Sequence, residues 1–560
     1  MVTLRAFIIR VVFSVVLISG FMPRAIAAEW QWSVTIPSIT SAETEEHPQA
    51  FLWIPSDCRQ VKAVVVGQHN MCEETLFENP AFRRKMQEAG IALVWITPIL
   101  DFPWDVTNGC NDALLTALDD LAEVSGYTEL RFAPIVPLGH SAMATFPWNF
   151  AAWNPERTLA VVSYHGDAPC TNLTGYGGAN LEWGRSRNID GIPGLMVEGE
   201  YEWWEARVNP ALAFRMMYPE SCISFLCDAG RGHFDVADRT AEYIGLFLKK
   251  AVEQRIPETA DCSRPVALKK LHPRDGWLAE RWRTGKYEPQ GEVRTARLAR
   301  QPRSRPAPYS QYKGDKHDAF WYFDGEMTEL TEAIYRQDHD LLPQYVSFMQ
   351  AGELVPYNPA SHVTLSARFL PEADGVTFRL KAVYTDSLRS SLTKEHAAST
   401  PRISRICGPV RQTDDTTFVL NFYRMGMNNK KRTASITLVA SADGDRQYKE
   451  CVQELSFSIP YPLTEGRRQH ILFPGIEDVS ADTKSVPLHA TSDCGLPVYY
   501  YVKEGPAEVE GNGLVLKKIP PRSKFPLKVT VVAWQYGLSG KVQTAEPVER
   551  SFYIEKLNTK

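Results

Sequence analysis

Short runs of β-branched and other apolar residues alternate with longer amphipathic stretches between residues 63 and 250. This alternation is typical of a parallel sheet flanked by helices, because a crossover helix joins each parallel strand to the next. The expected strands are 63–67, 91–96, 132–138, 159–163, 194–197 and 223–226, and the expected helices are 80–89, 112–124, 210–217 and 237–252. We therefore predict an α/β domain with a doubly wound, mostly parallel sheet over residues 28–255.

Helix patterns become rare after this domain. Residues 255–312 are rich in Pro, Arg and Lys and lack a sustained period, so we interpret 256–335 as a connector that wraps the α/β domain. Residues 362–370, 416–423 and 434–440 alternate apolar with polar side chains, as half-buried strands do. We therefore predict two all-β sandwich domains, over residues 336–465 and 466–560.

The N-terminus has the pattern of a secretory signal peptide. Arg5 and Arg10 precede an apolar stretch, 11–18, and Ala25 and Ala27 stand at the −3 and −1 positions of a cleavage site. The stretch is shorter than the roughly 20 apolar residues that a membrane anchor needs. We expect residues 1–27 to be removed, and we expect an exported protein, periplasmic or extracellular, that does not insert into a membrane.

Composition excludes some classes of function. The formal net charge is −5 and no block of Lys and Arg occurs, so nucleic acid is not an expected partner. The chain lacks Cys-x-x-Cys, His-x-x-x-His and EF-hand spacings, so we predict neither a metal site nor a cofactor. Ten cysteines in an exported chain are compatible with disulfides, for which three pairs are candidates: Cys222 with Cys227, Cys72 with Cys110, and Cys407 with Cys451.

One serine lies where an expected strand passes into an expected helix. Ser141 is the centre of the pentapeptide Gly139-His-Ser-Ala-Met143, which follows the apolar run 133–138 and precedes a helical stretch, 142–152. A serine on such a turn projects from the carboxyl edge of the sheet, next to the free amides of a helix N-terminus.

This region resembles the α/β-hydrolase superfamily in its order of elements and in the motif Gly-x-Ser-x-Gly, whose last glycine is replaced here by Met143. The resemblance implies that Ser141 is a nucleophile and that an acid and then a histidine follow it in the chain. His233, in the loop between the last expected strand and helix, occupies the position of the family's histidine. We assign the acid to Glu202, with Glu200 and Asp167 as alternatives.

An oxyanion hole requires two backbone amides. The residue after the nucleophile, Ala142, supplies the first. The second is expected in the loop that leaves the first central strand, from Asn70 or Met71.

Several tryptophans lie in or near the loops expected at this edge of the sheet, where flat rings can stack on sugars. The candidates for substrate binding are Trp104, Trp148, Trp183, Trp203 and Trp204. The insertion 167–190 is polar and rich in glycine, unlike the apolar lid of a lipase.

Residues 492–513 resemble the bacterial immunoglobulin-like modules of secreted proteins, which implies a spacer or adhesion role. Together these features indicate a secreted serine esterase that acts on acyl or methyl esters of plant or algal polysaccharides. The alternatives are a serine peptidase of the same superfamily and a non-catalytic carbohydrate-binding or adhesion protein on a hydrolase scaffold.

Overall fold

The computed structural model describes residues 29–171, 181–202, 204–282, 303–337, 341–359, 361, 363–423, 429 and 431–557. The expected signal peptide, residues 1–27, lies outside this part of the chain, as does Trp203.

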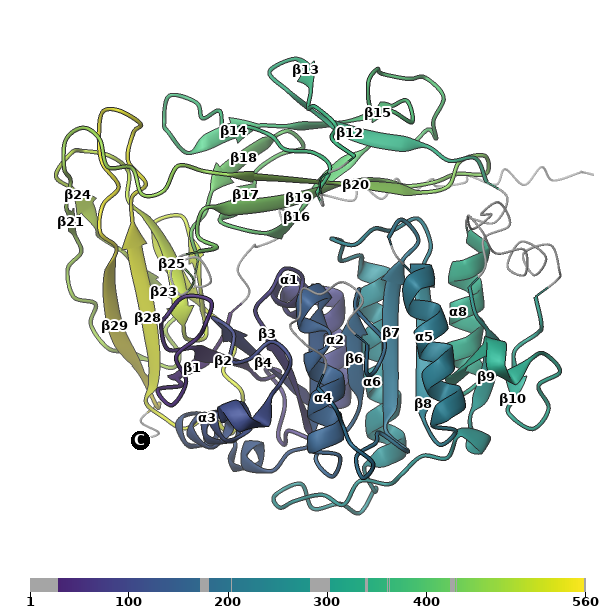
Figure 1. The fold of residues 1–560 in the computed structure, drawn as a ribbon. Helices are drawn as coiled ribbons and strands as arrows, with labels where there is room; N and C mark the ends of the chain where they lie inside the picture. The colour runs from purple at the N-terminus through teal and green to yellow at the C-terminus, as the bar shows by residue number, and fades with distance from the viewer. Residues whose placement is uncertain are drawn as a thin grey trace, which may run out of the picture.

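An eight-stranded sheet forms the first domain, in the order β1-β2-β4-β3-β5-β6-β7-β8 (Figure 1). Strands β3 to β8 run parallel to one another, whereas β1 and β2 pair antiparallel at one edge. The strands are β1 (Trp32–Thr35), β2 (Gln49–Trp53), β3 (Ala63–Gln68), β4 (Ile91–Thr97), β5 (Ile135–His140), β6 (Val161–Tyr164), β7 (Pro193–Gly199) and β8 (Cys222–Asp228). The predicted α/β class is confirmed.

Helices cover both faces of the sheet, which is why β3 to β8 are buried along their whole length. Val65 packs on the same side as α2 and α6, whereas Val64 and Val66 pack with α3 and α4. The helices are α1 (Glu73–Glu78), α2 (Pro80–Ala89), α3 (Cys110–Ser125), α4 (Phe146–Trp153), α5 (Trp204–Met217) and α6 (Asp238–Arg255). We call residues 29–255 the α/β domain.

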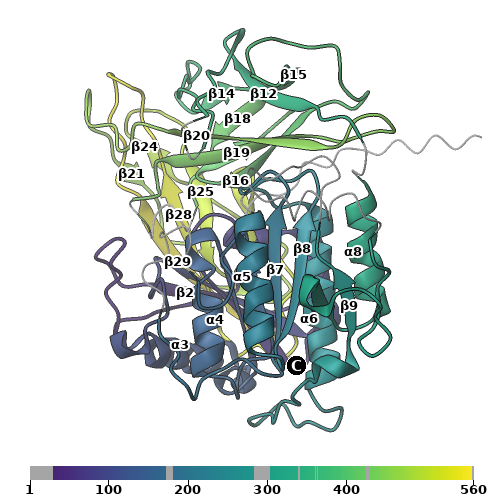
Figure 2. The same cartoon turned by 45° about the vertical axis from the view of Figure 1, so that its right-hand side comes forward.

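The segment predicted to be a connector has more regular structure than its composition indicated. It contains β9 (Trp277–Glu280), β10 (Ala307–Pro308), β11 (Ala319–Tyr322) and α8 (Gly325–Gln337). The Tyr322 hydroxyl donates to the Phe225 carbonyl over 2.6 Å, and Ser224 Oγ donates to the Trp321 carbonyl over 2.6 Å. These contacts hold the small sheet beside β8, where Figure 2 also shows it.

The described residues after 340 form strands and connecting turns, as predicted. Residues 341–465, the middle β domain, contain β12 (Tyr345–Gln350), β13 (Glu353–Leu354), β14 (Thr377–Arg379), β15 (Lys381–Thr385), β16 (Arg402–Cys407), β17 (Val410–Gln412), β18 (Thr417–Leu420), β19 (Ser435–Ala442) and β20 (Cys451–Ser458). Residues 466–557, the C-terminal β domain, contain β21 (Ile471–Leu472), β22 (Val479–Ser480), β23 (Ser485–Pro487), β24 (Thr491–Ser492), β25 (Tyr499–Glu504), β26 (Ala507–Glu510), β27 (Gly513–Leu516), β28 (Leu527–Trp534) and β29 (Val548–Glu555). Its immunoglobulin-like character stays a prediction.

Shared cores join the three domains. Val532 and Trp534 of β28 pack into the apolar core of the middle β domain. On the other side, Ser33 of β1 donates to Glu504 over 2.6 Å, and the Trp30 carbonyl accepts from the Gly505 amide. The C-terminal β domain therefore packs on both of the other domains.

The candidate disulfides are not formed, and all ten cysteines are free. Cys222 and Cys227 lie five residues apart on one extended strand, about 16 Å at 3.3 Å per residue. Cys407 and Cys451 lie on β16 and β20, which are separated by β19. Disulfide bonding requires Cα atoms within about 7 Å, which these positions do not allow.

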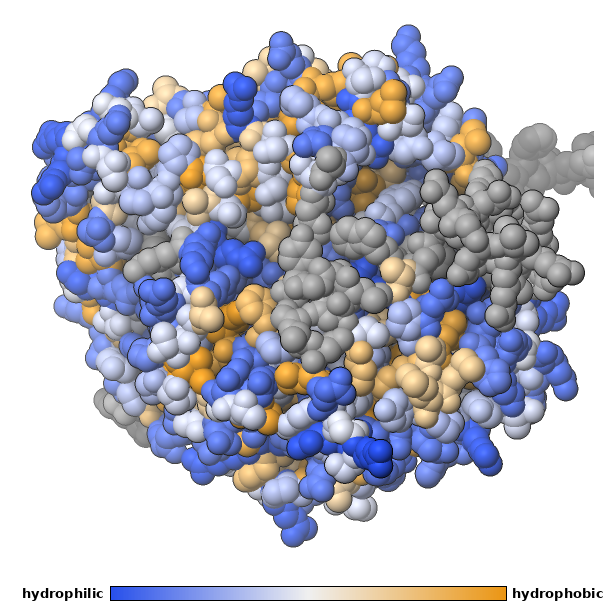
Figure 3. All heavy atoms as spheres, in the orientation of Figure 1, coloured by the Kyte–Doolittle hydropathy of each residue, from blue (hydrophilic) through white to orange (hydrophobic). Residues whose placement is uncertain are grey.

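None of the helices in the described part of the chain is long and apolar enough to span a bilayer. Figure 3 shows hydrophilic and hydrophobic residues interspersed on one face of the molecule.

Candidate active site

Ser141 sits on a strained turn directly after β5. Its φ is +54°, a left-handed conformation that is uncommon outside glycine, and a single turn of 3₁₀ helix, Ser141–Met143, leads toward α4. A Cβ atom on Gly139 would lie 2.0 Å from the Met143 carbonyl oxygen, so the turn requires glycine there. The Met143 side chain is buried in the apolar core, which explains how the turn accommodates a residue other than glycine at that position.

Ser141, His233 and Glu202 lie in one hydrogen-bonded line. Ser141 Oγ lies 2.8 Å from His233 Nε2, and His233 Nδ1 lies 2.5 Å from Glu202 Oε2. Because an ionised carboxylate only accepts hydrogen bonds, Nδ1 carries the proton and Nε2 is the acceptor for the serine hydroxyl. The sequence-predicted serine, histidine and first-choice acid are therefore placed together, in the arrangement by which a base activates a nucleophile.

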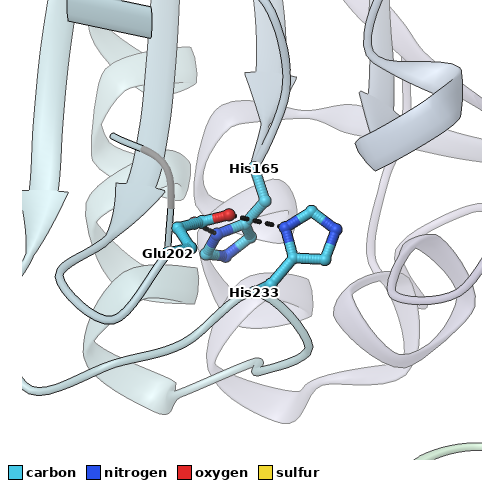
Figure 4. Close-up of side chains that lie close together, drawn as sticks. All are labelled: His165, Glu202 and His233. Carbon is cyan, nitrogen blue, oxygen red and sulfur yellow. Dashed lines mark hydrogen bonds and ion pairs between the residues drawn. The ribbon is translucent and has the colours of Figure 1, made fainter. Parts of the chain in front are cut away.

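Glu202 is a buried carboxylate whose charge is compensated locally. Its side chain is 1% exposed. Burial alone would raise its pKa, but His165 and His233 hold that pKa well below its usual range. Its Oε1 accepts hydrogen bonds from His165 Nδ1 and from the Gly199 amide, and Arg207 Nη1 lies 4.0 Å from Oε2. Figure 4 shows the two imidazoles on the same carboxylate.

The two alternative acids are engaged elsewhere. Glu200 accepts from the Gly230 amide over 2.9 Å and pairs with Lys449 over 2.6 Å. Asp167 pairs with Arg207 Nε over 3.3 Å. Of the three candidates, only Glu202 has a carboxylate hydrogen bond to His233 among those found in the described residues.

The backbone of His233 is held in place as well. His140 Nε2 donates to the His233 carbonyl over 3.0 Å, and both histidines are buried. Burial lowers the pKa of His233 below its usual value although Glu202 opposes that shift. His233 is therefore neutral, and able to accept a proton, at neutral pH.

The oxyanion loop differs from the prediction. The amides of Asn70 and Met71 both donate to Glu73 Oε2, over 3.2 and 3.0 Å, while the His140 amide donates to Glu73 Oε1 over 2.8 Å. A buried carboxylate at the start of α1 thus captures both predicted donors, and neither is free for an oxyanion in this arrangement. Ala142 follows Ser141 in the turn, and its role as the other donor stays a prediction.

Three of the five predicted substrate-binding tryptophans are core residues. Trp104 packs on Phe146 with ring centroids 5.0 Å apart, and it is fully buried. Trp148 donates to the Asp167 carbonyl over 3.0 Å, and Trp183 donates to Asn149 over 2.7 Å. Both rings are at most 3% exposed, because their polar edges find partners inside the domain. Trp204 begins α5, and Trp203 lies outside the described residues.

The middle β domain contacts the loops that complete the site, and Figures 1 and 2 show it along that edge of the α/β domain. Just before β20, Lys449 and Glu450 reach two loops: the one after β7 that carries Glu200 and Glu202, which we call the acid loop, and the one after β8 that carries Arg231 and His233, which we call the histidine loop. Lys449 pairs with Glu200, the Tyr201 hydroxyl donates to the Glu450 carbonyl over 3.1 Å, and Arg231 pairs with Glu450 over 3.2 Å.

Other residues of the same domain reach the loop after β3. Asn429 Nδ2 donates to His69 Nδ1 over 3.1 Å, and Thr75 Oγ1 donates to the Ile406 carbonyl. Cys407 Sγ lies 3.8 Å from Met71 Sδ. The acid loop, the histidine loop and the predicted oxyanion loop are all supported by the middle β domain.

Sequence reasoning did not find the supporting residues His165, Glu73, Arg207, Lys449 and Glu450. His165 and Glu73 follow the carboxyl ends of β6 and β3, where polar residues of a parallel sheet converge, and that signal was available. The two β-domain residues lie more than 200 positions from the loops that they contact, and no local pattern marks them.

His165, Glu202 and His233 also form a group of potential metal ligands, with ligand atoms within 4.8 Å of one another. The Nδ1 atom of each histidine is hydrogen-bonded to the Glu202 carboxylate. An ion bound there would displace the Nδ1 proton that orients His233 toward Ser141.

Replacing Glu73 should destabilise the fold. Glu73→Ala leaves the buried amides of Asn70, Met71 and His140 without their acceptor, so we expect the free energy of unfolding in urea to fall by about 1–3 kcal/mol. Glu88→Ala, on the exposed face of α2, is the control and should change it by less than about 0.5 kcal/mol. Equal stability of the two variants would contradict a structural role for Glu73.

No protein-family model matches this chain, and no match was found among curated proteins. Solved structures with similarity include an esterase from Pyrobaculum calidifontis, at 15% identity over 40% of this chain and 85% of that one, with a TM-score of 0.29. An S-formylglutathione hydrolase from Agrobacterium tumefaciens is 13% identical over 41% of this chain and 97% of that one, with a TM-score of 0.27. A dienelactone hydrolase from Anabaena variabilis is 17% identical over 40% and 96%, with a TM-score of 0.26. By its own strand order, strained serine turn and histidine loop, the α/β domain has the α/β-hydrolase fold.

Proposed function

We propose that this protein is a serine hydrolase of carboxylic esters. The observation that carries the proposal is the line from Ser141 Oγ through His233 to Glu202, with a 2.8 Å contact between nucleophile and base. A serine hydroxyl is a weak nucleophile unless a base removes its proton, and this geometry supports that transfer.

The chemistry follows from these positions. Ser141 Oγ attacks the ester carbonyl carbon while His233 Nε2 takes the hydroxyl proton, and the carbonyl oxygen becomes an oxyanion that the Ala142 amide stabilises. His233 then gives the proton to the leaving alcohol as the ester C–O bond breaks. Water, deprotonated by His233, attacks the acyl-enzyme and restores Ser141. Glu202 stays ionised and stabilises the imidazolium in both halves.

For the substrate, we propose acyl or methyl esters on plant or algal polysaccharides, hydrolysed outside the cytoplasm. Three features support this substrate class: the expected signal peptide, the polar and glycine-rich composition of the insertion 167–190, and the two β domains. Trp104, Trp148 and Trp183 do not support a polysaccharide substrate, because these rings are buried and cannot stack on a sugar.

Ser141→Ala should abolish ester hydrolysis. We expect kcat on p-nitrophenyl acetate to fall by about 10³-fold or more, because no other group replaces the nucleophile. Ser56→Ala, in an exposed turn, is the matched control and should retain full activity.

The same two variants, tested on acetylated, feruloylated and methyl-esterified glycans and on a peptide anilide, separate the polysaccharide esterase from the peptidase. Absence of turnover on every substrate would favour a binding protein.

The pH dependence should report His233. The base must be neutral to act, and burial lowers its pKa below the usual 6.5. We therefore expect kcat/KM to rise with pH through an apparent pKa below 6.5 and to be fully developed at neutral pH. A rise centred above about pH 7 would contradict the assigned base and its environment.

The contact between Lys449 and Glu200 should matter for turnover. Lys449→Met leaves Glu200, on the acid loop, without its cation. A loss of about 1 kcal/mol in the positioning of that loop corresponds to a roughly fivefold lower kcat. Lys503→Met removes a similar pair, with Glu549, in the C-terminal β domain and should leave kcat unchanged. Equal kcat in the two variants would show that the middle β domain does not position the acid loop.

A further inference from the structure

His165 is a buried histidine that the proposed mechanism does not use. It follows β6, its side chain is 1% exposed, and its φ of +52° is strained for a residue other than glycine. Its backbone amide donates to the Val197 carbonyl over 2.7 Å, which fixes it against the end of β7. Its imidazole meets the same carboxylate as His233, with ring centroids 5.8 Å apart (Figure 4).

The two oxygens of Glu202 have different partners. Oε1 accepts from His165 Nδ1 and from the Gly199 amide, and Oε2 accepts from His233 Nδ1. A carboxylate with one oxygen bound by two donors cannot rotate freely, so its second oxygen stays directed at His233. The competing partner is Arg207, whose Nη1 lies 4.0 Å from Oε2 and 3.5 Å from Glu198 Oε2.

We infer that His165 is a positioning residue for catalysis: it holds Glu202 so that the carboxylate orients His233 rather than turning toward Arg207. This inference rests on the proposed function. His165 acts through the hydrogen bond that its Nδ1–H donates, which holds the charge of Glu202 beside the imidazolium that forms on His233. Tyr164, with its ring centroid 4.1 Å away, and His140, at 5.6 Å, pack against the His165 ring and keep it in place.

Two substitutions separate hydrogen bonding from packing. His165→Asn keeps an N–H donor close to the position of Nδ1, and asparagine tolerates a positive φ. His165→Leu has about the same bulk and no donor. We expect the Leu variant to lose about 10- to 100-fold in kcat with little change in KM, and the Asn variant to stay within about threefold of the wild type.

The pH profile gives a readout that packing alone would not move. Without the His165 donor, Glu202 turns toward Arg207 and no longer supports the charged form of His233, so the acid limb of kcat/KM should move to lower pH in the Leu variant and stay in place in the Asn variant. The other titratable groups that interact with Glu202 or His233 are Cys72, His140, Tyr164, Glu198, Arg207, Cys227 and Glu454, and both variants leave all of them unchanged.

Phosphonylation by an alkyl fluorophosphonate measures the nucleophile without an ester substrate. Ser141 Oγ bonds to phosphorus, fluoride leaves, and His233 takes the hydroxyl proton. In variants with unchanged melting temperature, slow labelling of Leu and fast labelling of Asn supports the inference. Labelling of Leu at the wild-type rate, or equal slowing in both variants, overturns it.

If the wild type neither hydrolyses esters nor is labelled, the proposed function fails. The positioning role of His165 is then tested separately, by the NMR resonances of the imidazole N–H protons. A downfield His233 signal that is lost in the Leu variant and kept in the Asn variant supports the positioning role. A signal that is unchanged in both variants overturns it.

Discussion

The charge on Glu202 is the interaction on which the site depends. A carboxylate that is 1% exposed is costly to ionise unless donors and cations surround it. Here two imidazoles, the Gly199 amide and the more distant Arg207 supply that environment. Once Glu202 is ionised, the tautomer of His233 follows, and with it the ability of His233 to accept the Ser141 proton.

The neighbouring Glu198 shows how local this arrangement is. It lies on β7, and burial raises its pKa well above the usual value, whereas the pKa of Glu202 is held well below. Both carboxyls face Arg207, but only Glu202 faces the two imidazoles. The contrast indicates that the histidines, more than the arginine, keep Glu202 charged.

The middle β domain extends this support outside the α/β domain. Its contacts reach Glu200 and Tyr201 on the acid loop, Arg231 on the histidine loop and Met71 on the loop after β3. These loops connect rigid strands to helices, and loops alone hold their side chains less firmly than strands do. The middle β domain is therefore better described as part of the site than as a spacer appended to it.

Much of this could be predicted from sequence, because local patterns encode it. The buried strands follow from periodicity, and the resemblance in motif and order of elements implied the turn at Ser141 and the loop of His233. The hydrogen bonds from the Asn70 and Met71 amides to Glu73 could not be predicted from sequence, since they depend on how the Glu73 side chain folds back toward the loop. Trp104 was assigned to a loop surface because its sequence neighbours look like a loop, yet it packs between aromatic rings of α4.

The contacts that the middle β domain makes with the acid and histidine loops could not be predicted from sequence for a different reason. Lys449 and Glu450 are ordinary charged residues before a strand, and only tertiary packing brings them to the acid loop. From their charge and spacing alone, such residues are predicted to lie on a solvent-exposed surface.

Trapping the acyl-enzyme tests most directly whether Ser141 is the nucleophile. Rapid acid quenching of the wild type during turnover of an activated ester, followed by peptide mass spectrometry, should find the acyl group on the peptide that contains Ser141. An acyl group on a different residue, or hydrolysis that proceeds with no covalent adduct, would contradict the central claim.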